Sequence, residues 1–186
     1  LLNRRGLSLA AQPLLEQARR TGHSLHLLFS DVDNLKVIND RHGHLAGDAA
    51  LVALAQAMRR SIRGSDVIAR VGGDEFVVIL PDSSEPTRHF VLDRLAEHLH
   101  DELARIQAPH AVTVTTGWAQ FDPTHHATLD ALLSEADAAM YERKNVRRPG
   151  ARTVGSDARR GTAKPRGDPP TEVRSSTSRP RKVRRS

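Results

Sequence analysis

The chain of 186 residues contains no cysteine. A disulfide framework and a cysteine-based zinc site are therefore excluded, and cysteine usage does not fix the redox compartment. No apolar run approaches the roughly 20 residues that a membrane-spanning helix needs, and no signal peptide is visible. An initial Met is also missing, because the chain begins Leu1-Leu2-Asn3, and we expect it to be a fragment of a longer protein.

Charge is distributed unevenly along the chain. Residues 150–186 hold eleven Lys or Arg and three Asp or Glu, a net charge of +8. Because the whole chain carries +6, residues 1–149 carry −2. The basic segment is rich in Pro, Ser, Gly, Thr and Arg and has few large apolar residues, which predicts a disordered tail. Such a tail could bind acidic lipid or nucleic acid electrostatically, but a solvated extension without a specific role is the preferred interpretation.

Hydrophobic periodicity divides residues 1–149 into helices and strands. Apolar spacings of three and four residues predict helices over 6–22, 47–62, 84–106 and 129–144. Pro13 favours a late start for the first helix, and a polar loop or short helix is expected at 36–44. Strands are predicted over 25–30 and 112–121, with a hairpin over 66–80. The order contains a βαββαβ unit, which predicts an α+β sandwich: a ferredoxin-like sheet with helices on one face, plus extra N- and C-terminal helices.

The predicted hairpin is the most informative stretch. Gly72 and Gly73 separate two runs rich in β-branched residues, which is a strong hairpin signal. Glycines at the bend also let another molecule approach the backbone closely. Two carboxylates, Asp74 and Glu75, follow directly. A plain turn would also favour polar residues, so the hairpin alone does not establish a function.

A second acidic site lies about forty residues upstream, where a buried strand ends in Asp31-Val32-Asp33. If that strand lies beside the hairpin, Asp31 can converge with Asp74 or Glu75 on one divalent cation. Mg²⁺ typically takes one or two carboxylates and completes its shell with substrate phosphates. Asp33, two residues further on, would share the strand face of Asp31 and is a weaker candidate, with a structural hydrogen-bonding role as the alternative.

These stretches resemble the GGDEF family of diguanylate cyclases, and the resemblance covers about residues 1–149. The sequence from Gly72 to Phe76 is the family signature unaltered. Residues 31–40 and 43–48 are similar to a second family block. Residues 1–5 match the end of an N-terminal block that normally begins with Asp-x-Leu-Thr-Gly. The resemblance implies the palm-type core of nucleotidyl cyclases and polymerases.

The activity implied by the resemblance is condensation of two GTP into cyclic di-GMP and two pyrophosphates, with Mg²⁺ or Mn²⁺ as cofactor. Asp31 and Asp74 are then the expected metal ligands, with the Val32 carbonyl as a third. Glu75 would bind a second metal ion or help to deprotonate the 3′-hydroxyl. Each domain holds one GTP, so the family pattern implies a catalytic homodimer.

Further residues match the family positions that bind substrate. Asn39 and Asp48 correspond to the guanine-reading pair: a carboxylate accepts from N1–H and the 2-amino group, and an amide supplies complementary hydrogen bonds. Without the resemblance, Asp48 would be interpreted as a helix N-terminal residue stabilised by the helix dipole. Gly72 and Gly73 complete this part of the implied substrate site.

Phosphate-binding cations are expected at Lys36 and at the end of the last helix. Lys144 and Arg148 match a family run of the form Lys-x-x-Gly-Arg-Asn, and residues four apart share one helix face. The chain departs from that run at two positions, where Arg147 and Pro149 replace the family's Gly and Asn.

An Arg-x-x-Asp pattern precedes the hairpin. Arg63 and Asp66 match the family's inhibitory site, at which the product cyclic di-GMP binds. Arg presents a fork suited to guanine or phosphate, and Asp can read the guanine edge. Arg94 is a candidate second contact. The alternative interpretation is a surface salt bridge of little energetic weight.

The sequence therefore predicts a diguanylate cyclase domain from the cytoplasm of a bacterium, belonging to a larger sensory protein. The main alternative is a catalytically silent receptor that binds cyclic di-GMP at Arg63 and Asp66. The intact signature argues against the receptor, whereas Arg147 and Pro149 argue slightly for it. A weaker alternative is a tail-driven binder of nucleic acid or membrane. No specific nucleic acid is expected, and membrane contact is expected only through the tail or the parent protein.

Overall fold

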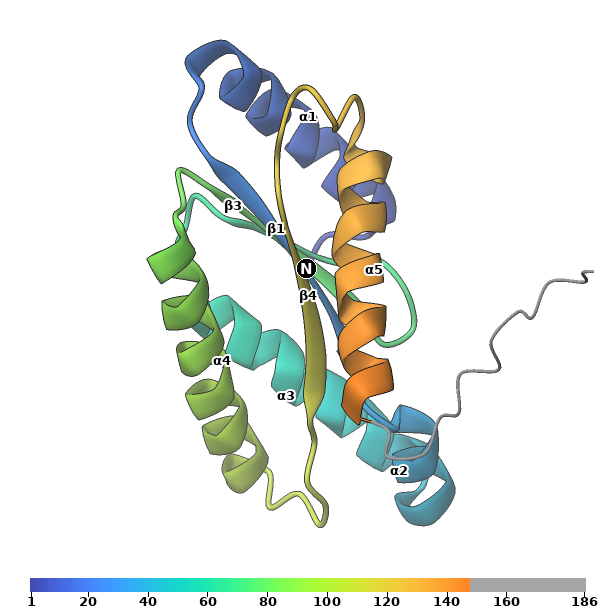
Figure 1. Cartoon of the computed structure of the whole chain (residues 1–186). Coiled ribbons are helices and arrows are strands. Elements are labelled where there is room, and N and C mark those ends of the chain that lie inside the picture. The colour runs from blue at the N-terminus through green and yellow to red at the C-terminus, as the bar shows by residue number, and fades with distance from the viewer. Residues whose placement is uncertain (148–186) are drawn as a thin grey trace, which may run out of the picture. The chain divides into compact units, whose positions relative to one another are not determined.

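The computed structural model describes residues 1–147 (Figure 1). These residues form, in order, α1 (Arg4–Thr21), β1 (Leu25–Val32), α2 (Leu35–His42), α3 (His44–Ser61), β2 (Val67–Arg70), β3 (Glu75–Pro81), α4 (Glu85–Arg105), β4 (Val114–Gln120) and α5 (Leu129–Arg147). The predicted basic tail at 150–186 lies outside the described residues.

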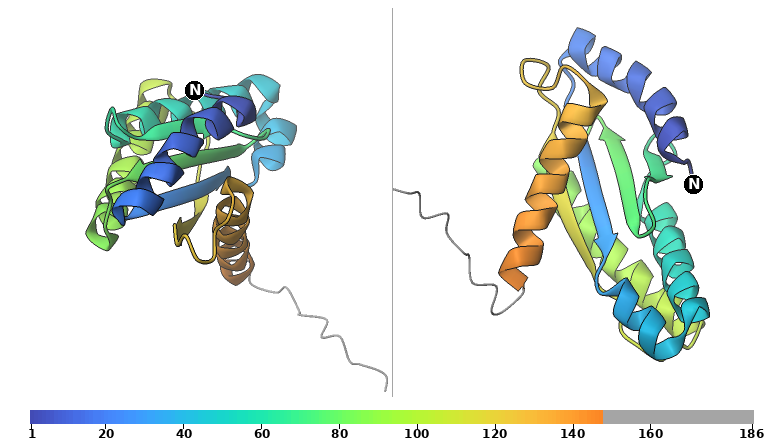
Figure 2. Two further views of the ribbon diagram at one scale, coloured as in Figure 1. Left: turned by 90° about the horizontal axis from the view of Figure 1, so that it is seen from above. Right: turned by 90° about the vertical axis from the view of Figure 1, so that its right-hand side faces the viewer.

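The four strands form one sheet in the order β2-β3-β1-β4, and every neighbouring pair is antiparallel. Helices α3 and α4 cover one face of the sheet, and α1 and α5 lie against the other (Figures 1 and 2). The predicted α+β sandwich with a βαββαβ core is confirmed. The expectation of helices on one face holds for α3 and α4, while the additional helices α1 and α5 cover the opposite face.

Side-chain alternation along β1 decides what each face of the sheet carries. Leu27 and Phe29 pack in the cluster formed with α1 and α5, whereas Leu28 packs in the cluster formed with α3 and α4. Because side chains alternate with a period of two, Asp31 continues the face of Leu27 and Phe29. In β3 the same alternation places Glu75 on this face. Both carboxylates are therefore directed to the side of the sheet that α5 covers.

Helix α1 begins earlier than predicted. The Asn3 side chain accepts a hydrogen bond from the Gly6 backbone N–H at 2.8 Å and caps the helix, so Pro13 lies inside it. An internal proline removes one backbone hydrogen bond. Fully buried Leu7 and Ala11, both N-terminal to the proline, offset this cost by packing against the sheet.

Residues 36–44, expected to be a loop or short helix, are largely helical as α2. The turn that leads into α2 places Asn34 in the left-handed region at φ 56°, a conformation that Asn tolerates better than most residues. Helix α3 begins at His44, three residues before the predicted start. Asp48 is therefore beyond the first turn, which removes the helix-dipole interpretation of its role.

One buried histidine lies at the far end of β1 from the acidic residues. The Ser83 hydroxyl donates to the Leu80 carbonyl at 2.7 Å, so the Nδ1–H of His26 donates to the Ser83 oxygen at 2.8 Å. The His26 ring stacks on Trp118, and its Nε2 has no hydrogen-bond partner among the described residues. Burial lowers the pKa of His26.

This histidine should make the domain less stable in mild acid. Because the unfolded chain binds the proton more readily, the His26 contribution is complete above about pH 6.5 and declines as the pH falls toward the lowered folded-state pKa. Urea unfolding followed by the fluorescence of Trp118, the single Trp, should show a shallower acid decline in His26→Gln than in wild type. Exposed His44→Gln is the matched control and should retain the wild-type decline; equal slopes for all three proteins would contradict the assignment.

Candidate active site

The acidic residues at the ends of β1 and β3 lie together. Asp31 is directly opposite Glu75 in the antiparallel register, and the Val32 N–H donates to the Asp74 carbonyl at 3.3 Å. Directly opposed residues of an antiparallel pair project from the same face with Cβ atoms roughly 5 Å apart. The structure thus juxtaposes two acidic sites that are about forty residues apart in the sequence.

The signature turn has specific steric requirements. A Cβ atom on Gly72 would overlap the Glu75 carboxylate, whereas one on Gly73 would meet open space. Arg70 clamps the turn, because its Nε and Nη2 both donate to the Gly73 carbonyl, at 3.2 and 2.5 Å. The sequence interpretation missed Arg70, which reads as an ordinary strand residue; its position two residues before the glycines was the available signal.

Asp31 is held by a cation from α5. The Lys144 ammonium lies 2.5 Å from Asp31 Oδ1. Burial raises the pKa of Asp31; the hydrogen bond from Lys144 opposes that shift, and the charges of Asp74 and Asp33 add to it. The net upward direction means that Lys144 does not fully offset burial and the like charges beside Asp31.

Glu75 carries a similar excess of negative charge. Burial raises its pKa, and the charges of Asp74, Asp137 and Asp31 raise it further. Asp137 was not predicted from the sequence, where it belongs to the polar face of an amphipathic helix. It precedes Lys144 by seven residues, about two helical turns, and so shares its side of α5.

These carboxylates fit a hard divalent cation that is shared with a phosphate ligand. Within residues 1–147, no group of three or more His, Cys, Asp or Glu side chains is arranged as a complete metal cage. Mg²⁺ does not require one, since it commonly takes one or two carboxylates and substrate phosphates. Burial and neighbouring carboxylates raise the pKa values of Asp31 and Glu75, and a bound cation would offset both effects.

Asp33 is engaged differently from Asp31. Its carboxylate accepts from the hydroxyls of Thr113 and Thr115, at 2.8 and 2.6 Å. It lies in the turn after β1 and its backbone N–H donates to the Thr113 carbonyl at 2.9 Å. These contacts tie the turn to β4 and favour the structural role that the sequence left open.

The predicted guanine-reading residues lie near α3. A Cβ atom on Gly47 would overlap the Asn39 side-chain oxygen, so this glycine lets the amide pack against the start of α3. That oxygen is buried and has no hydrogen-bond partner among residues 1–147. Asp48, next to Gly47, borders a cavity of about 520 Å³ together with Arg70 and Phe76.

The predicted phosphate-binding residues are only partly described. Lys36 is exposed on α2, and Lys144 contacts Asp31. Helix α5 extends through Arg147. Arg148 and Pro149 lie outside the described residues.

The three predicted inhibitory residues border one small cavity. The Arg63 N–H donates to Asp66 at 2.7 Å, and the Arg94 guanidinium donates to the Arg60 carbonyl at 2.6 Å. Burial raises the pKa of Asp66, opposed by the Arg63 backbone hydrogen bond. Arg63 and Asp66 are brought to Arg94 by the packing of α3 against α4.

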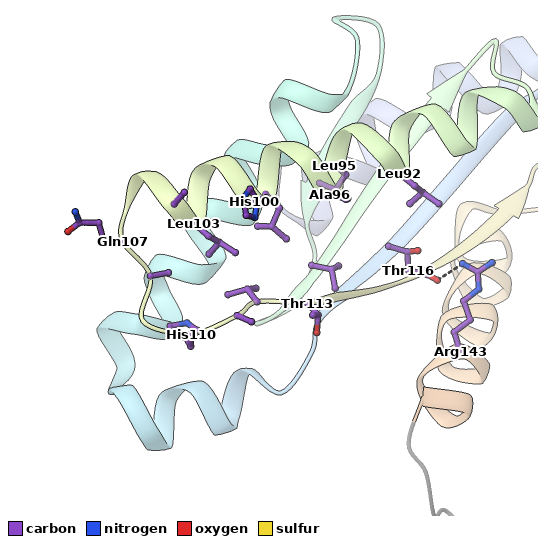
Figure 3. A pocket seen from close by; sticks show the side chains of 16 residues that line it. Leu92, Leu95, Ala96, His100, Leu103, Gln107, His110, Thr113, Thr116 and Arg143 are labelled. Carbon is purple, nitrogen blue, oxygen red and sulfur yellow. Dashed lines mark hydrogen bonds between the residues drawn. The ribbon is translucent and has the colours of Figure 1, made fainter.

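A separate cavity of about 730 Å³ lies between α4 and β4 (Figure 3). Leu92, Leu95 and Leu103 line it, and Arg143, which donates to the Thr116 carbonyl at 3.0 Å, lies at one end. Its lining contains no carboxylate. It therefore does not match the chemistry of a metal and phosphate site, and we do not place the nucleotide there.

Comparison with known proteins gives a consistent result. The family model described as "Diguanylate cyclase, GGDEF domain" matches residues 1–149. The chain is 36% identical to the probable diguanylate cyclase DgcE of Escherichia coli over 146 residues, covering 78% of this chain and 13% of that protein. It is 39% identical to the diguanylate cyclase TpbB of Pseudomonas aeruginosa over 142 residues, covering 72% of this chain and 31% of that protein.

Solved structures agree with these sequence relatives. The GGDEF domain of TpbB superimposes with a TM-score of 0.67 at 37% identity, covering 78% of this chain and 91% of that one. The GGDEF domain of DgcB from Caulobacter crescentus, in complex with c-di-GMP, gives a TM-score of 0.66 at 27% identity, covering 78% and 84%.

The fold and the acidic turn define a GGDEF domain. The chain belongs to the GGDEF-domain diguanylate cyclase family. It spans less than a third of the length of the two curated relatives described above. In the described part of the chain, no helix combines the length and apolar character needed to cross a membrane.

Proposed function

We propose that this domain is a diguanylate cyclase. The 3′-oxygen of one GTP attacks the α-phosphorus of a second, a P–O bond forms, and the bond to the β-phosphate bridging oxygen breaks to release pyrophosphate. The 3′-oxygen of the second nucleotide then attacks the α-phosphorus of the first, which releases the second pyrophosphate and closes the ring. The products are one cyclic di-GMP and two pyrophosphates, and the two hydroxyl protons pass to a base or to solvent.

The observation that carries this proposal is the register that opposes Asp31 and Glu75 beside the Lys144 ammonium. The reaction needs charge neutralisation at the α-phosphate and pyrophosphate and a means of activating the 3′-hydroxyl. A bound Mg²⁺ or Mn²⁺ would supply the first and lower the pKa of the hydroxyl. Asp31, Asp74 and the Val32 carbonyl would hold it.

Glu75 has a raised pKa, caused first by burial and then by its acidic neighbours. A carboxylate of increased basicity suits transient acceptance of the 3′-hydroxyl proton, and the same side chain is suited to a second metal ion. Gly72 leaves room for this carboxylate. Gly73, with open space around its Cα, would let a phosphate approach the backbone.

Asp48, at the cavity beside α3, and Asn39, which packs against Gly47, would read guanine. The phosphates would be bound by Lys36, Lys144 and Arg148. One domain has one set of these residues. Two GTP molecules therefore require two domains facing each other, and the rate should rise more than linearly with protein concentration.

The product cyclic di-GMP would bind at Arg63, Asp66 and Arg94 and slow the enzyme.

The proposal is tested by incubating the protein with GTP and Mg²⁺ and separating the nucleotides chromatographically, with Glu75→Ala in parallel. Cyclic di-GMP from wild type alone supports a cyclase. A folded protein without turnover that binds cyclic di-GMP in a titration would instead be a receptor, a function supported by the common location of Arg63, Asp66 and Arg94.

Product inhibition should depend on Arg63. Removing its guanidinium deletes a charge-assisted contact to the product, so Arg63→Ala should raise the inhibition constant for cyclic di-GMP about tenfold. Initial rates at increasing product concentration measure this. Arg59→Ala removes an exposed Arg of α3, four residues before Arg63, and should keep wild-type inhibition. Identical curves for all three proteins would eliminate this inhibitory site.

A further inference from the structure

The ion pair between Lys144 and Asp31 has a second consequence. The ammonium lies 2.5 Å from Asp31 Oδ1, and the two side chains are 26% and 14% exposed. Lys144 is thus the ion-pair partner, within the described protein, of the carboxylate that we assign to the divalent cation. A metal ion that binds Asp31 must therefore compete with the Lys144 ammonium for its carboxylate.

The other nearby basic side chains have different partners. Arg143 donates to the Thr116 carbonyl, and Arg70 donates to the Gly73 carbonyl. In residues 1–147, Lys144 is the one basic residue that forms an ion pair with Asp31, Asp74 or Glu75. It therefore compensates Asp31 directly, whereas the positive charge that lowers the pKa of Glu75 is that of Arg4.

We propose that Lys144 is an exchangeable counter-ion: it neutralises Asp31 until a divalent cation arrives, and is then released to bind a nucleotide phosphate. This inference rests on the proposed function, because it assumes that the site takes a divalent cation. A lysine suits the task, since its compact ammonium sits on a flexible four-carbon stem with three donors. Lys144 is also partly exposed, so the ammonium can leave Asp31 without breaking the packing of α5.

Exchange makes metal and nucleotide binding cooperative. A metal ion alone must displace Lys144 and then remain beside an unpartnered ammonium. When a triphosphate is also bound, the released ammonium gains an anionic partner. Because such a coupling is reciprocal, bound metal should strengthen phosphate binding by the same factor. The ion pair between Lys144 and Asp31 therefore disfavours the binding of metal alone and favours the complex that contains both metal and nucleotide.

The test uses Mn²⁺ alone, without nucleotide, titrated into metal-free protein while the electron paramagnetic resonance signal of free Mn²⁺ is followed. Lys144→Met keeps the apolar stem and removes the charge. An opposite charge within 4–6 Å commonly shifts a carboxylate pKa by one to three units, and Lys144 is partly exposed, so we expect Lys144→Met to bind Mn²⁺ about tenfold more tightly than wild type.

Arg143→Met is the matched control, because it removes the neighbouring charge on α5 from a side chain whose partner is the Thr116 carbonyl. Its Mn²⁺ affinity should stay within about twofold of wild type if the effect belongs to the ion pair. Unchanged or weaker binding in folded Lys144→Met overturns the proposal. An equal increase in Mn²⁺ affinity in Lys144→Met and Arg143→Met also overturns the proposal, because that increase would reflect only the change in net charge.

Folding is checked by circular dichroism, and Lys144→Gln provides a second neutral variant. The thermal shift on adding Mn²⁺ gives an independent readout, and it should be larger for Lys144→Met than for wild type. If neither protein binds Mn²⁺, both the metal site and the counter-ion role are overturned. Tighter Mn²⁺ binding in a protein without GTP turnover would refute the cyclase activity while supporting the counter-ion.

Discussion

Replacing Asp31 with Asn should lower the rate of cyclic di-GMP formation by about a thousandfold. The substitution keeps size and hydrogen-bonding capacity but removes the charge that we assign to the metal. Asp31 is the one carboxylate in β1, where it lies opposite Glu75 and pairs with Lys144, so no other carboxylate of that strand can take its place. Initial rates with GTP and saturating Mg²⁺ measure the loss.

Asp33→Asn is the matched control, since it makes the same change two residues away. The Asp33 carboxylate accepts from Thr113 and Thr115 and ties the turn to β4. We therefore expect a moderate loss of stability and a rate within about tenfold of wild type. Equal rate losses in both variants would show that the structure does not distinguish a metal ligand from a structural carboxylate here.

Gly117→Ala should destabilise the domain by about 3 kcal/mol, at the upper end of ordinary overpacking effects. A Cβ atom on Gly117 would overlap the Ala136 carbonyl oxygen and crowd the backbone nitrogen of Met140. Both obstacles are main-chain atoms of α5, which cannot move away as a flexible side chain can. Urea denaturation measures the change in the free energy of unfolding.

Gly64→Ala controls for the loss of a glycine as such, because a Cβ atom there meets no heavy atom within 4 Å. Its free energy of unfolding should change by no more than about 0.5 kcal/mol. Gly117→Ala should also slow the reaction in protein that remains folded, because displacement of α5 moves Lys144 away from Asp31. Wild-type stability in Gly117→Ala would contradict the close approach of α5 to β4.

Short-range patterns were sufficient to predict most of the fold. The buried run that forms β1 and the Gly-Gly turn indicated where the two central strands end, and antiparallel pairing in the structure places Asp31 opposite Glu75. The prediction for the first helix, over 6–22 with Pro13 favouring a late start, did not use Asn3 as a cap, whereas α1 begins at Arg4. A cap and four buried residues outweigh one missing hydrogen bond.

Contacts made between distant elements could not be predicted in this way. The carboxylate of Asp33 finds its partners about eighty residues away, at Thr113 and Thr115. Asp137 looks like an ordinary exposed position of a helix, and its effect on Glu75 arises only when α5 packs against the sheet. Side-chain partners of this kind depend on tertiary packing, which local periodicity does not encode.

The most direct test of the cyclase assignment is the stoichiometry of the reaction with GTP and Mg²⁺. Pyrophosphate and cyclic di-GMP should be quantified together over one time course at two protein concentrations. Two pyrophosphates should appear for each cyclic di-GMP, at a rate that rises more than linearly with protein. Folded protein that binds Mn²⁺ but releases neither product at either concentration would contradict the assignment.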